Sequence, residues 1–278
     1  NGGTSSNNVV ITFGENLSFY SYYFIIGSQY ITFEGNYKIV TINGVVNYLG
    51  LIQNGKSSVN GFANVIINNI IMTQTSSTLL NGSGWIAQSY FSKGASFCYI
   101  NNCSTDSTCS SLATSSTSGL ICGTATNGTI CKYCSSAGAI SAGGIFGSSA
   151  TNCQAINCFT TGNIGNASFS AGAGGIFARS CNNTNQASQC YSSGTINSNT
   201  GYGSGGICGE SCGVVVSNCY SSGTINSTSS SKSGGIFGNG SSGTATNCYS
   251  SGVIISNGVG IGGTEPQTKC YAANGAWS

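Results

Sequence analysis

The stretch GGIFG at residues 234–238, followed by NCYSSGVI at residues 247–254, is one copy of a pattern that recurs along the chain. Its first phrase, Gly-x-Ile, begins at residues 50, 84, 119, 143, 174, 205 and 234, and fades at residue 262. The second phrase, in its clean copies an Asn or Gln before a Cys, keeps nearly the same interval. Two landmarks with one interval indicate a continuous stack of similar supersecondary units.

Within a unit the segments are short and β-like. ATNCYS at residues 245–250 and GTIN at residues 223–226 alternate or nearly alternate in polarity between Gly and Ser clusters, which is typical of strands. No unit contains a helix-length periodic stretch. Strands with two or three corners per unit predict an all-β parallel β-helix (β-solenoid) of about nine or ten coils. A β-sandwich with accidental internal similarity is the alternative.

The repeated isoleucine of the first phrase should point inward and form an aliphatic ladder. The glycines before it should turn a corner that needs a positive φ or a close approach of the backbone. A column of asparagines before the cysteines should stack its amides at another corner. The predicted core ladder is Ile52, Ile86, Ile121, Ile145, Ile176, Ile207 and Ile236, and the asparagine column is Asn69, Asn102, Asn157, Asn218 and Asn247.

The chain changes in character near residue 95. Residues 1–95 are more aliphatic and free of cysteine, as in VVITF at 9–13, whereas residues 96–278 are rich in Cys and Gly. We expect wider, better-filled coils in the first part. Because no linker separates the two parts, we predict a single solenoid domain over residues 1–278.

Charge is nearly absent. Seven basic and five acidic residues make 4% of the chain and leave a net charge of +2, against roughly 25% charged residues in ordinary soluble domains. The chain has no cluster of basic residues, so nucleic-acid binding is not expected. No apolar run approaches the ~20 residues of a membrane-spanning helix, so we expect no membrane insertion. The chain begins at Asn1, and any signal peptide is expected to have been removed or to lie outside this sequence.

Cysteines and glycosylation sequons together indicate an extracellular protein or one on a cell or virion surface. Fifteen cysteines favour an oxidising compartment, and Asn-x-Ser/Thr sequons mark acceptors for N-glycans. The alternative for the cysteines is a set of buried thiols in a cytosolic protein. The candidate glycosylation sites are Asn16, Asn81, Asn102, Asn127, Asn166, Asn182, Asn226 and Asn239.

The cysteines divide into two sets. We expect the off-ladder cysteines to staple corner loops to the ladder through disulfides, because coil spacing fits the separation that a disulfide needs. The ladder set is Cys103, Cys134, Cys158, Cys190, Cys219, Cys248 and Cys270, and the off-ladder set is Cys98, Cys109, Cys122, Cys131, Cys153, Cys181, Cys208 and Cys212. The odd total leaves at least one thiol free or paired with another chain.

No metal site or cofactor is predicted. The CxxC at 131–134 and the CxxxC at 208–212 lie about three coils apart, whereas a structural zinc site needs four nearby ligands. A redox CxxC would need a thioredoxin-like βαβ context, which is missing. Structural disulfides are the favoured interpretation of both motifs.

Catalytic residues are not evident either. The five carboxylates lie at different phases of the repeat, whereas glycoside hydrolysis needs two carboxyl groups across the scissile bond. The chain contains no His, the commonest general base. Arg179 is the only arginine and has no acidic cluster near it in sequence. We therefore predict no enzyme, and keep a polysaccharide-acting β-helix enzyme as an alternative.

The unit at 234–254 resembles the GLUG repeat of bacterial and other surface and adhesin-like proteins. The stretch at 25–36, IIGSQYITFEGN, resembles the opening coils of pectate-lyase-like right-handed β-helices. These resemblances imply a right-handed solenoid and a cell-surface setting. They bring no catalytic residues to this chain.

The expected function is structural: a secreted surface glycoprotein whose solenoid ends meet other copies or further domains, so building a fibre or surface layer. The alternative is an adhesin or binding module, in which corner loops at 104–118, 180–188 and 198–204 recognise a glycan or a protein. Assembly into a polymer would favour the first function, and ligand affinity in a monomer the second.

Overall fold

The computed structural model describes residues 3–5, 7–111, 117–165, 172–197, 202–227, 232–256, 258–265 and 267–273. These residues form short strands joined by turns and contain no helix. Accordingly, no helix in the described ranges is long and apolar enough to cross a membrane. The chain is therefore an all-β protein, as predicted.

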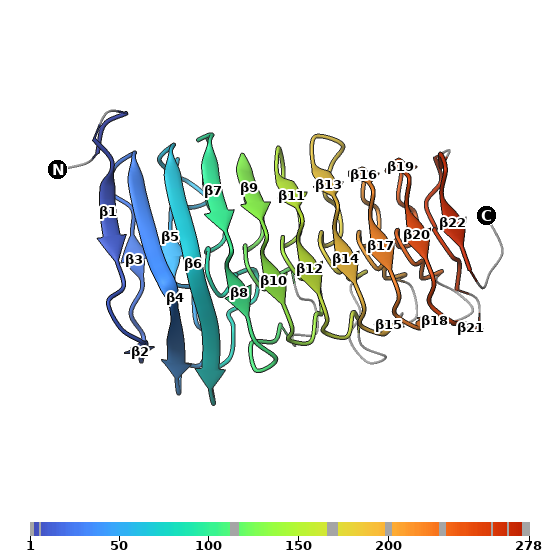
Figure 1. Cartoon of the computed structure of the whole chain (residues 1–278), viewed down its shortest axis with the longest axis horizontal. Coiled ribbons are helices and arrows are strands. Elements are labelled where there is room, and N and C mark those ends of the chain that lie inside the picture. Colours follow the sequence, from blue (N-terminus) through green and yellow to red (C-terminus); the bar gives the residue numbers. More distant parts are fainter. Residues whose placement is uncertain are drawn as a thin grey trace.

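Most strands belong to one sheet of 17 strands, accompanied by sheets of three and two strands. Figure 1 shows the coils in sequence order along the long axis, with β1 and β22 at opposite ends. The first six strands are β1 (Val9–Thr12), β2 (Leu17–Phe19), β3 (Phe24–Ile25), β4 (Ile31–Asn43), β5 (Ile52–Gln53) and β6 (Val65–Thr75). Then come β7 (Cys98–Asn101), β8 (Ser104–Thr105), β9 (Thr129–Lys132), β10 (Ser135–Ser136), β11 (Gln154–Ile156), β12 (Phe159–Thr160), β13 (Gln186–Ser188) and β14 (Tyr191–Ser192). The last eight are β15 (Ile196–Asn197), β16 (Val215–Ser217), β17 (Tyr220–Ser221), β18 (Ile225–Ser227), β19 (Ala245–Thr246), β20 (Tyr249–Ser250), β21 (Ile254–Ser256) and β22 (Tyr271–Ala272).

Every strand pairs in parallel with the equivalent strand of the neighbouring coil. In one coil β16, β17 and β18 follow each other, and they pair with β19, β20 and β21 of the next coil. The register is continuous: Tyr191 pairs with Tyr220, which pairs with Tyr249. Since equivalent residues of successive units lie side by side, the sequence repeat is the coil repeat of a parallel solenoid.

A left-handed residue recurs at one position of successive coils, and from β7 to β20 it separates two strands of the coil. The segment ATNCYS, expected to be one strand, is two strands, β19 and β20, which meet at Asn247 with φ 54°. Of the predicted asparagine column, one neighbouring pair is joined by a side-chain hydrogen bond, in which Asn247 Nδ2 donates to Asn218 Oδ1 at 3.2 Å. Asparagine tolerates this backbone region better than most residues. The equivalent positions with positive φ are Asn69, Asn102, Tyr133, Asn157, Gln189, Asn218, Asn247 and Lys269.

The interior of the coils is apolar. All seven isoleucines of the predicted ladder are fully buried, and Ile207 N–H donates to Ile236 C=O at 3.0 Å, one coil onward. Beside them the Phe146 and Phe177 rings stack 4.9 Å apart. Toward the N-terminus β4 and β6 are 13 and 11 residues long, and large aliphatic and aromatic side chains fill the interior there.

Candidate functional site

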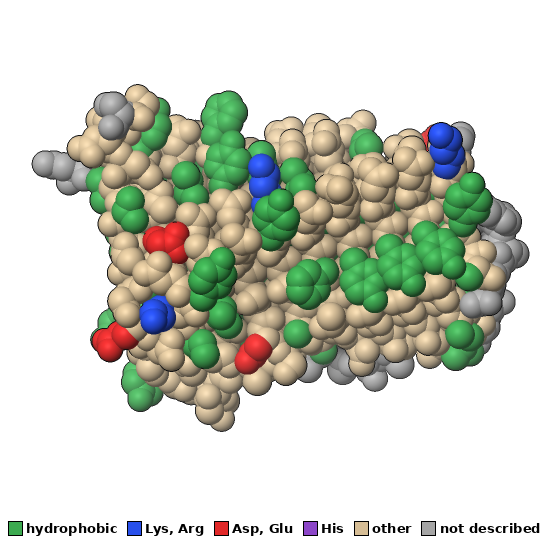
Figure 2. All heavy atoms as spheres, in the orientation of Figure 1, with side chains coloured by type: hydrophobic (Ala, Val, Ile, Leu, Met, Phe, Trp, Pro, Cys, Tyr) green, Lys and Arg blue, Asp and Glu red, His purple; other side chains and the backbone are tan. Residues whose placement is uncertain are grey.

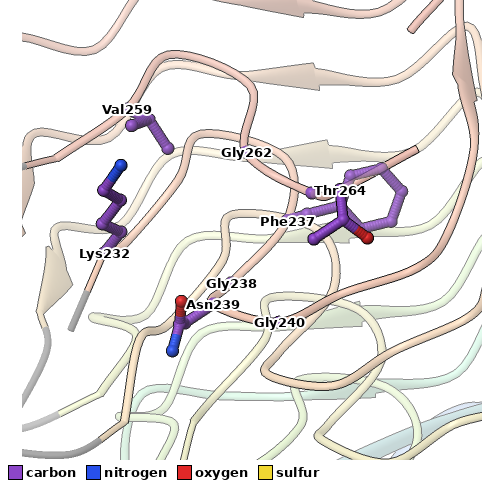
Figure 3. A pocket seen from close by; sticks show the side chains of 9 residues that line it. Lys232, Phe237, Gly238, Asn239, Gly240, Val259, Gly262 and Thr264 are labelled. Carbon is purple, nitrogen blue, oxygen red and sulfur yellow. The ribbon is translucent and has the colours of Figure 1, made fainter. Parts of the chain in front are cut away.

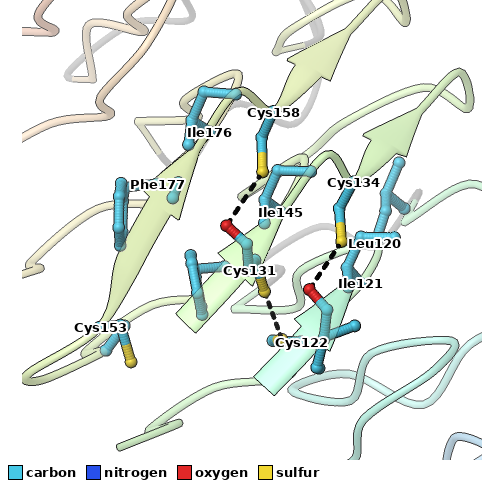
Figure 4. Packing of buried hydrophobic residues seen from close by; sticks show 14 of the residues in the cluster. Leu120, Ile121, Cys122, Cys131, Cys134, Ile145, Cys153, Cys158, Ile176 and Phe177 are labelled. Carbon is cyan, nitrogen blue, oxygen red and sulfur yellow. Dashed lines mark hydrogen bonds between the residues drawn. The ribbon is translucent and has the colours of Figure 1, made fainter. Parts of the chain in front are cut away.

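The ladder cysteines form a column of thiols inside the solenoid. All seven are buried. Their thiols point at backbone carbonyls of the preceding coil: Cys134 Sγ donates to Ile100 C=O at 3.2 Å, and Cys158 Sγ to Cys131 C=O at 3.4 Å. Figure 4 shows these two contacts and the isoleucines packed around them. The column thus connects successive coils through weak side-chain hydrogen bonds.

The off-ladder cysteines also point inward. Cys131 in β9 pairs with Ala155 of the next coil, and Cys122 forms a parallel bridge with Phe146. Their sulfur atoms approach each other across the interior, at 3.6 Å between Cys122 Sγ and Cys131 Sγ (Figure 4). All eight off-ladder cysteines are buried. None of them holds a corner loop from outside.

The predicted disulfide staples are therefore absent from this structure, in which all fifteen cysteines are free thiols. The physical reason is that cysteine here serves as a small hydrophobic residue. The Cys131 position is occupied by Ala155 in the next coil and by Ala187 in the one after, side chains of similar size. Packing therefore explains these inward cysteines without disulfides, and the extracellular setting stays a prediction.

Burial also makes several of these thiols poor nucleophiles, whereas burial is outweighed at Cys158 and Cys219, where hydrogen bonds from neighbouring ladder thiols lower the pKa. Loss of solvent raises the pKa of Cys103 to about 12 and raises the pKa of Cys98, so that the protonated form dominates at neutral pH. The thiolate is the nucleophile and the metal ligand. Among the described residues no group of three Cys, Asp or Glu side chains is arranged to hold a metal ion.

The carboxylates are dispersed, with one charged pair that the sequence did not reveal. Glu34 accepts a hydrogen bond from Asn69 Nδ2 at 2.8 Å. Burial raises the pKa of the Glu210 carboxyl, and the Arg179 guanidinium, one coil earlier, partly offsets this rise. The Arg179 guanidinium also lies 5.9 Å from the ring centroid of Tyr202. This is a charge interaction between neighbouring coils, and it involves one carboxylate.

The candidate glycosylation sites are accessible where the structure describes them. Asn127 is half-buried and donates through Nδ2 to Thr151 Oγ1 at 2.6 Å. Asn166 lies outside the described residues. The other six are exposed: Asn16, Asn81, Asn102, Asn182, Asn226 and Asn239.

The corner loops line shallow hollows rather than a deep cleft. The loop at 180–188 borders a hollow of about 550 Å³ together with Glu265, and the loop at 104–118 contributes Thr108 and Ser110 to one of about 220 Å³. A third hollow of about 310 Å³, near the C-terminal coils, contains Lys232 and the ring of Phe237 (Figure 3). Residues 112–116 and 198–201 of the predicted binding loops lie outside the described residues.

Sequence reasoning missed a row of exposed and half-buried rings on the outer face. Phe159, Tyr191, Tyr220, Tyr249 and Tyr271 occupy one register position in successive coils, and we call them the aromatic stripe. Figure 2 shows rings following one another over β12, β14, β17 and β20. The signal in the sequence was the Phe or Tyr that directly follows a ladder cysteine. Because neighbouring residues of a strand point to opposite faces, an inward Cys puts this ring outside.

The structure is thus that of an all-β protein built on a large parallel sheet. No family model and no curated protein matches its sequence. Among solved structures, the chain is similar to a crystal structure described as that of a candidate immunoglobulin A1 protease from Bacteroides ovatus. The identity is 17% and the TM-score 0.47, over 97% of this chain and 86% of that chain. A likeness of this size carries no argument about activity.

Proposed function

We propose that this chain is a non-catalytic structural protein of a cell or virion surface, a rod whose coil stack continues end to end into other copies or adjoining domains. The observation that carries the proposal is the strand pairing. Among the described strands, β1 and β2 pair only with β4, and β22 pairs only with β20. Within the described part of the chain, each terminal coil thus has one strand edge on which no further strand is seen, and such an edge is a template for another chain.

The winding is proposed to be right-handed, with about nine or ten coils. Parallel strands joined by a crossover connection are right-handed in nearly all proteins, and every strand pairing between coils here is parallel. With a coil spacing of about 4.8 Å, the rod would be on the order of 45 Å long. The GLUG-like phrases support the same architecture.

A surface setting is proposed on the exposed sequons rather than on the cysteines. Exposed asparagines such as Asn16, Asn182 and Asn239 would be open to a glycosyltransferase in a secretory compartment. The low charge supports the proposal as well, because attached glycans would supply the solubility that charged side chains give most proteins.

An adhesin or binding module is the second candidate. The hollow beside the loop at 180–188, about 550 Å³ in volume and lined by Asn182, Asn183 and Glu265, is the observation that favours it. Its amide and carboxylate groups could hydrogen-bond a polar ligand. Ligand binding by monomeric protein, abolished by changes in this loop, would support this candidate over the structural one.

The edge variant Val10→Lys tests the structural proposal. Val10 lies in the terminal strand β1 and is 55% exposed, and charges on edge strands oppose pairing with another chain. We expect the unmodified protein to assemble as its concentration rises in sedimentation velocity, and Val10→Lys to sediment as single rods.

The matched control is Val215→Lys, since Val215 is 42% exposed in β16, a strand with a neighbour on each side. This variant should assemble like the unmodified protein. Single rods of unmodified protein at every concentration would refute end-to-end stacking, and so would equal assembly of Val10→Lys.

A further inference from the structure

We propose that the aromatic stripe binds the extended chain of a neutral polysaccharide along the long axis of the solenoid. This inference goes beyond the structural role proposed above and does not depend on it. The site is the outer face over β12, β14, β17, β20 and β22.

The spacing of the rings suits a repeating ligand. The ring centroids of Tyr191 and Tyr220 are 5.2 Å apart with planes 11° from parallel, and those of Tyr220 and Tyr249 are 5.3 Å apart at 7°. The sugar units of an extended 1,4-linked β-glycan repeat at a similar interval. A chain lying along the stripe would therefore meet an equivalent ring at each successive sugar.

The rings are held in place before any ligand arrives. The Tyr191 hydroxyl forms a hydrogen bond with Ser222 Oγ at 2.8 Å, and the Tyr220 hydroxyl forms one with Ser251 Oγ at 2.5 Å, in both cases reaching the next coil. Ring stacking and these hydrogen bonds fix the side-chain rotamers. A surface fixed in advance loses less conformational entropy on binding.

The chemistry of the stripe favours a sugar. Pyranose rings present C–H groups on their faces, and such positive groups are attracted to the electron-rich faces of aromatic rings. Because Tyr191, Tyr220 and Tyr249 are stacked on one another, the part of each ring that the neighbouring ring does not cover is the part that a sugar can contact. The serine or threonine directly after each of Phe159, Tyr191, Tyr220 and Tyr249 is buried. The hydroxyl groups beside the rings are those of the tyrosines themselves and of Ser222 and Ser251. Tyr249 is 40% exposed and Tyr271 62%, so part of each ring is open to a ligand.

Charge distinguishes among possible ligands. The five strands that carry the stripe contain no Lys, Arg, Asp or Glu. Apart from the exposed Lys269, two residues before Tyr271, the stripe and its strands offer no cation to neutralise phosphates or uronates. A face with so little charge is complementary to a neutral glycan. A nucleic acid or an acidic polysaccharide is therefore disfavoured.

The stripe is too narrow to be a dimer interface by itself. It is one ring wide, and five partly exposed rings offer a few hundred Å² of apolar surface. A stable protein interface buries roughly 800 Å² per partner. A chain one sugar wide fits this surface better than a second copy of the protein does.

The test is binding of the full chain to insoluble cellulose and chitin, both neutral and extended, with amylose, a helical neutral glucan, and polygalacturonate, an acidic glycan, as comparisons. We expect saturable binding to at least one extended glycan and much weaker binding to the other two. Tyr220→Leu keeps an apolar side chain but removes the aromatic face, and should weaken binding about three- to tenfold. The matched control is Tyr22→Leu, since Tyr22 is 70% exposed and lies outside the stripe.

The proposal would be overturned by an absence of binding to either extended glycan, or by binding that Tyr220→Leu and Tyr249→Leu leave unchanged. Preference for polygalacturonate would overturn it as well. If Tyr220→Leu fails to fold by circular dichroism, Tyr271→Leu at the terminal coil provides the same comparison. Because the assay can be read on single rods, failure of glycan binding is distinguishable from failure of end-to-end assembly.

Discussion

The carbonyl oxygen of Gly235 lies only 2.1 Å from the point that a Cβ atom on Gly206 would occupy. The same approach occurs one coil earlier, where a Cβ on Gly175 would lie 2.1 Å from the carbonyl oxygen of Gly206. None of these glycines has a positive φ. In the coils that carry Gly-Gly-Ile, the second glycine is therefore required because the backbone of the next coil passes directly over it.

Gly206→Ala should therefore destabilise the protein by about 1–3 kcal/mol, because the next coil must move to admit a methyl group. The measurement is the free energy of unfolding in urea. The matched control is Gly27→Ala, where a Cβ would meet nothing within 4 Å, and this variant should be neutral or slightly stabilising. Equal stability of the two variants would show that the coils do not approach as described.

Ile207→Ala tests the aliphatic ladder. Ile207 is fully buried, so truncation should cost about 2–5 kcal/mol through lost burial and the cavity left behind. Ile255→Ala removes the same atoms from a side chain that is 49% exposed, and should change the free energy of unfolding by no more than about 0.5 kcal/mol. Chemical denaturation of both variants measures the difference. A small loss for Ile207→Ala would mean that its side chain does not lie in the core.

Asp106 should make stability depend on pH. Burial alone would raise the pKa of its carboxyl, but hydrogen bonds from Thr108, Thr73 and two backbone N–H groups lower it below the usual 3.8. Thr108 N–H donates to Asp106 Oδ1 at 2.9 Å. Because the folded pKa lies below the unfolded one, this stabilisation is complete above pH 3.8 and is lost as the pH falls through the folded value.

Asp106→Asn should then cost about 0.5–1 kcal/mol at neutral pH, a modest figure because the side chain is largely solvated. Thermal unfolding of both proteins across an acid series measures the effect, and their difference should shrink as the pH decreases below 3.8. A difference that grows with acid would contradict the assigned hydrogen bonds.

The thiols should be silent in the folded protein and reactive after unfolding. Burial holds the pKa of Cys103 at about 12, and all fifteen cysteines are enclosed. We expect almost no reaction with a colorimetric disulfide reagent under native conditions, and fifteen equivalents after denaturation without reductant. A count that reaches fifteen only after reduction would show that the purified protein contains disulfides.

The parallel all-β architecture could be predicted because its evidence is periodic. The Gly-x-Ile and Asn-Cys phrases recur at nearly the same interval. Two separate phrases keep one interval when each repeat forms one coil of a stack. The corner at Asn247 was less accessible, since ATNCYS alternates like a single strand. The left-handed backbone of Asn247 interrupts the strand. The alternation of polar and apolar residues does not reveal a single residue with positive φ.

The cysteines show what the sequence could not decide. Cys131 occupies the same inward register position as Ala155 and Ala187 of the following coils, which makes it a packing residue. A Cys in a loop would instead be a candidate for a disulfide. That distinction depends on the direction of the Cα–Cβ bond, which the count and spacing of cysteines do not contain. The aromatic stripe was missed for a related reason. That each ring lies on the outer face follows only once the cysteine before it is known to point inward.

Electron microscopy of the purified, unlabelled protein tests the central claim most directly. The structural account predicts ordered filaments whose axis follows the solenoid, with an axial repeat close to one rod length and strands spaced about 4.8 Å along the fibre. Dispersed single rods across the accessible range of concentrations would contradict it, and would leave ligand binding as the leading function of this chain.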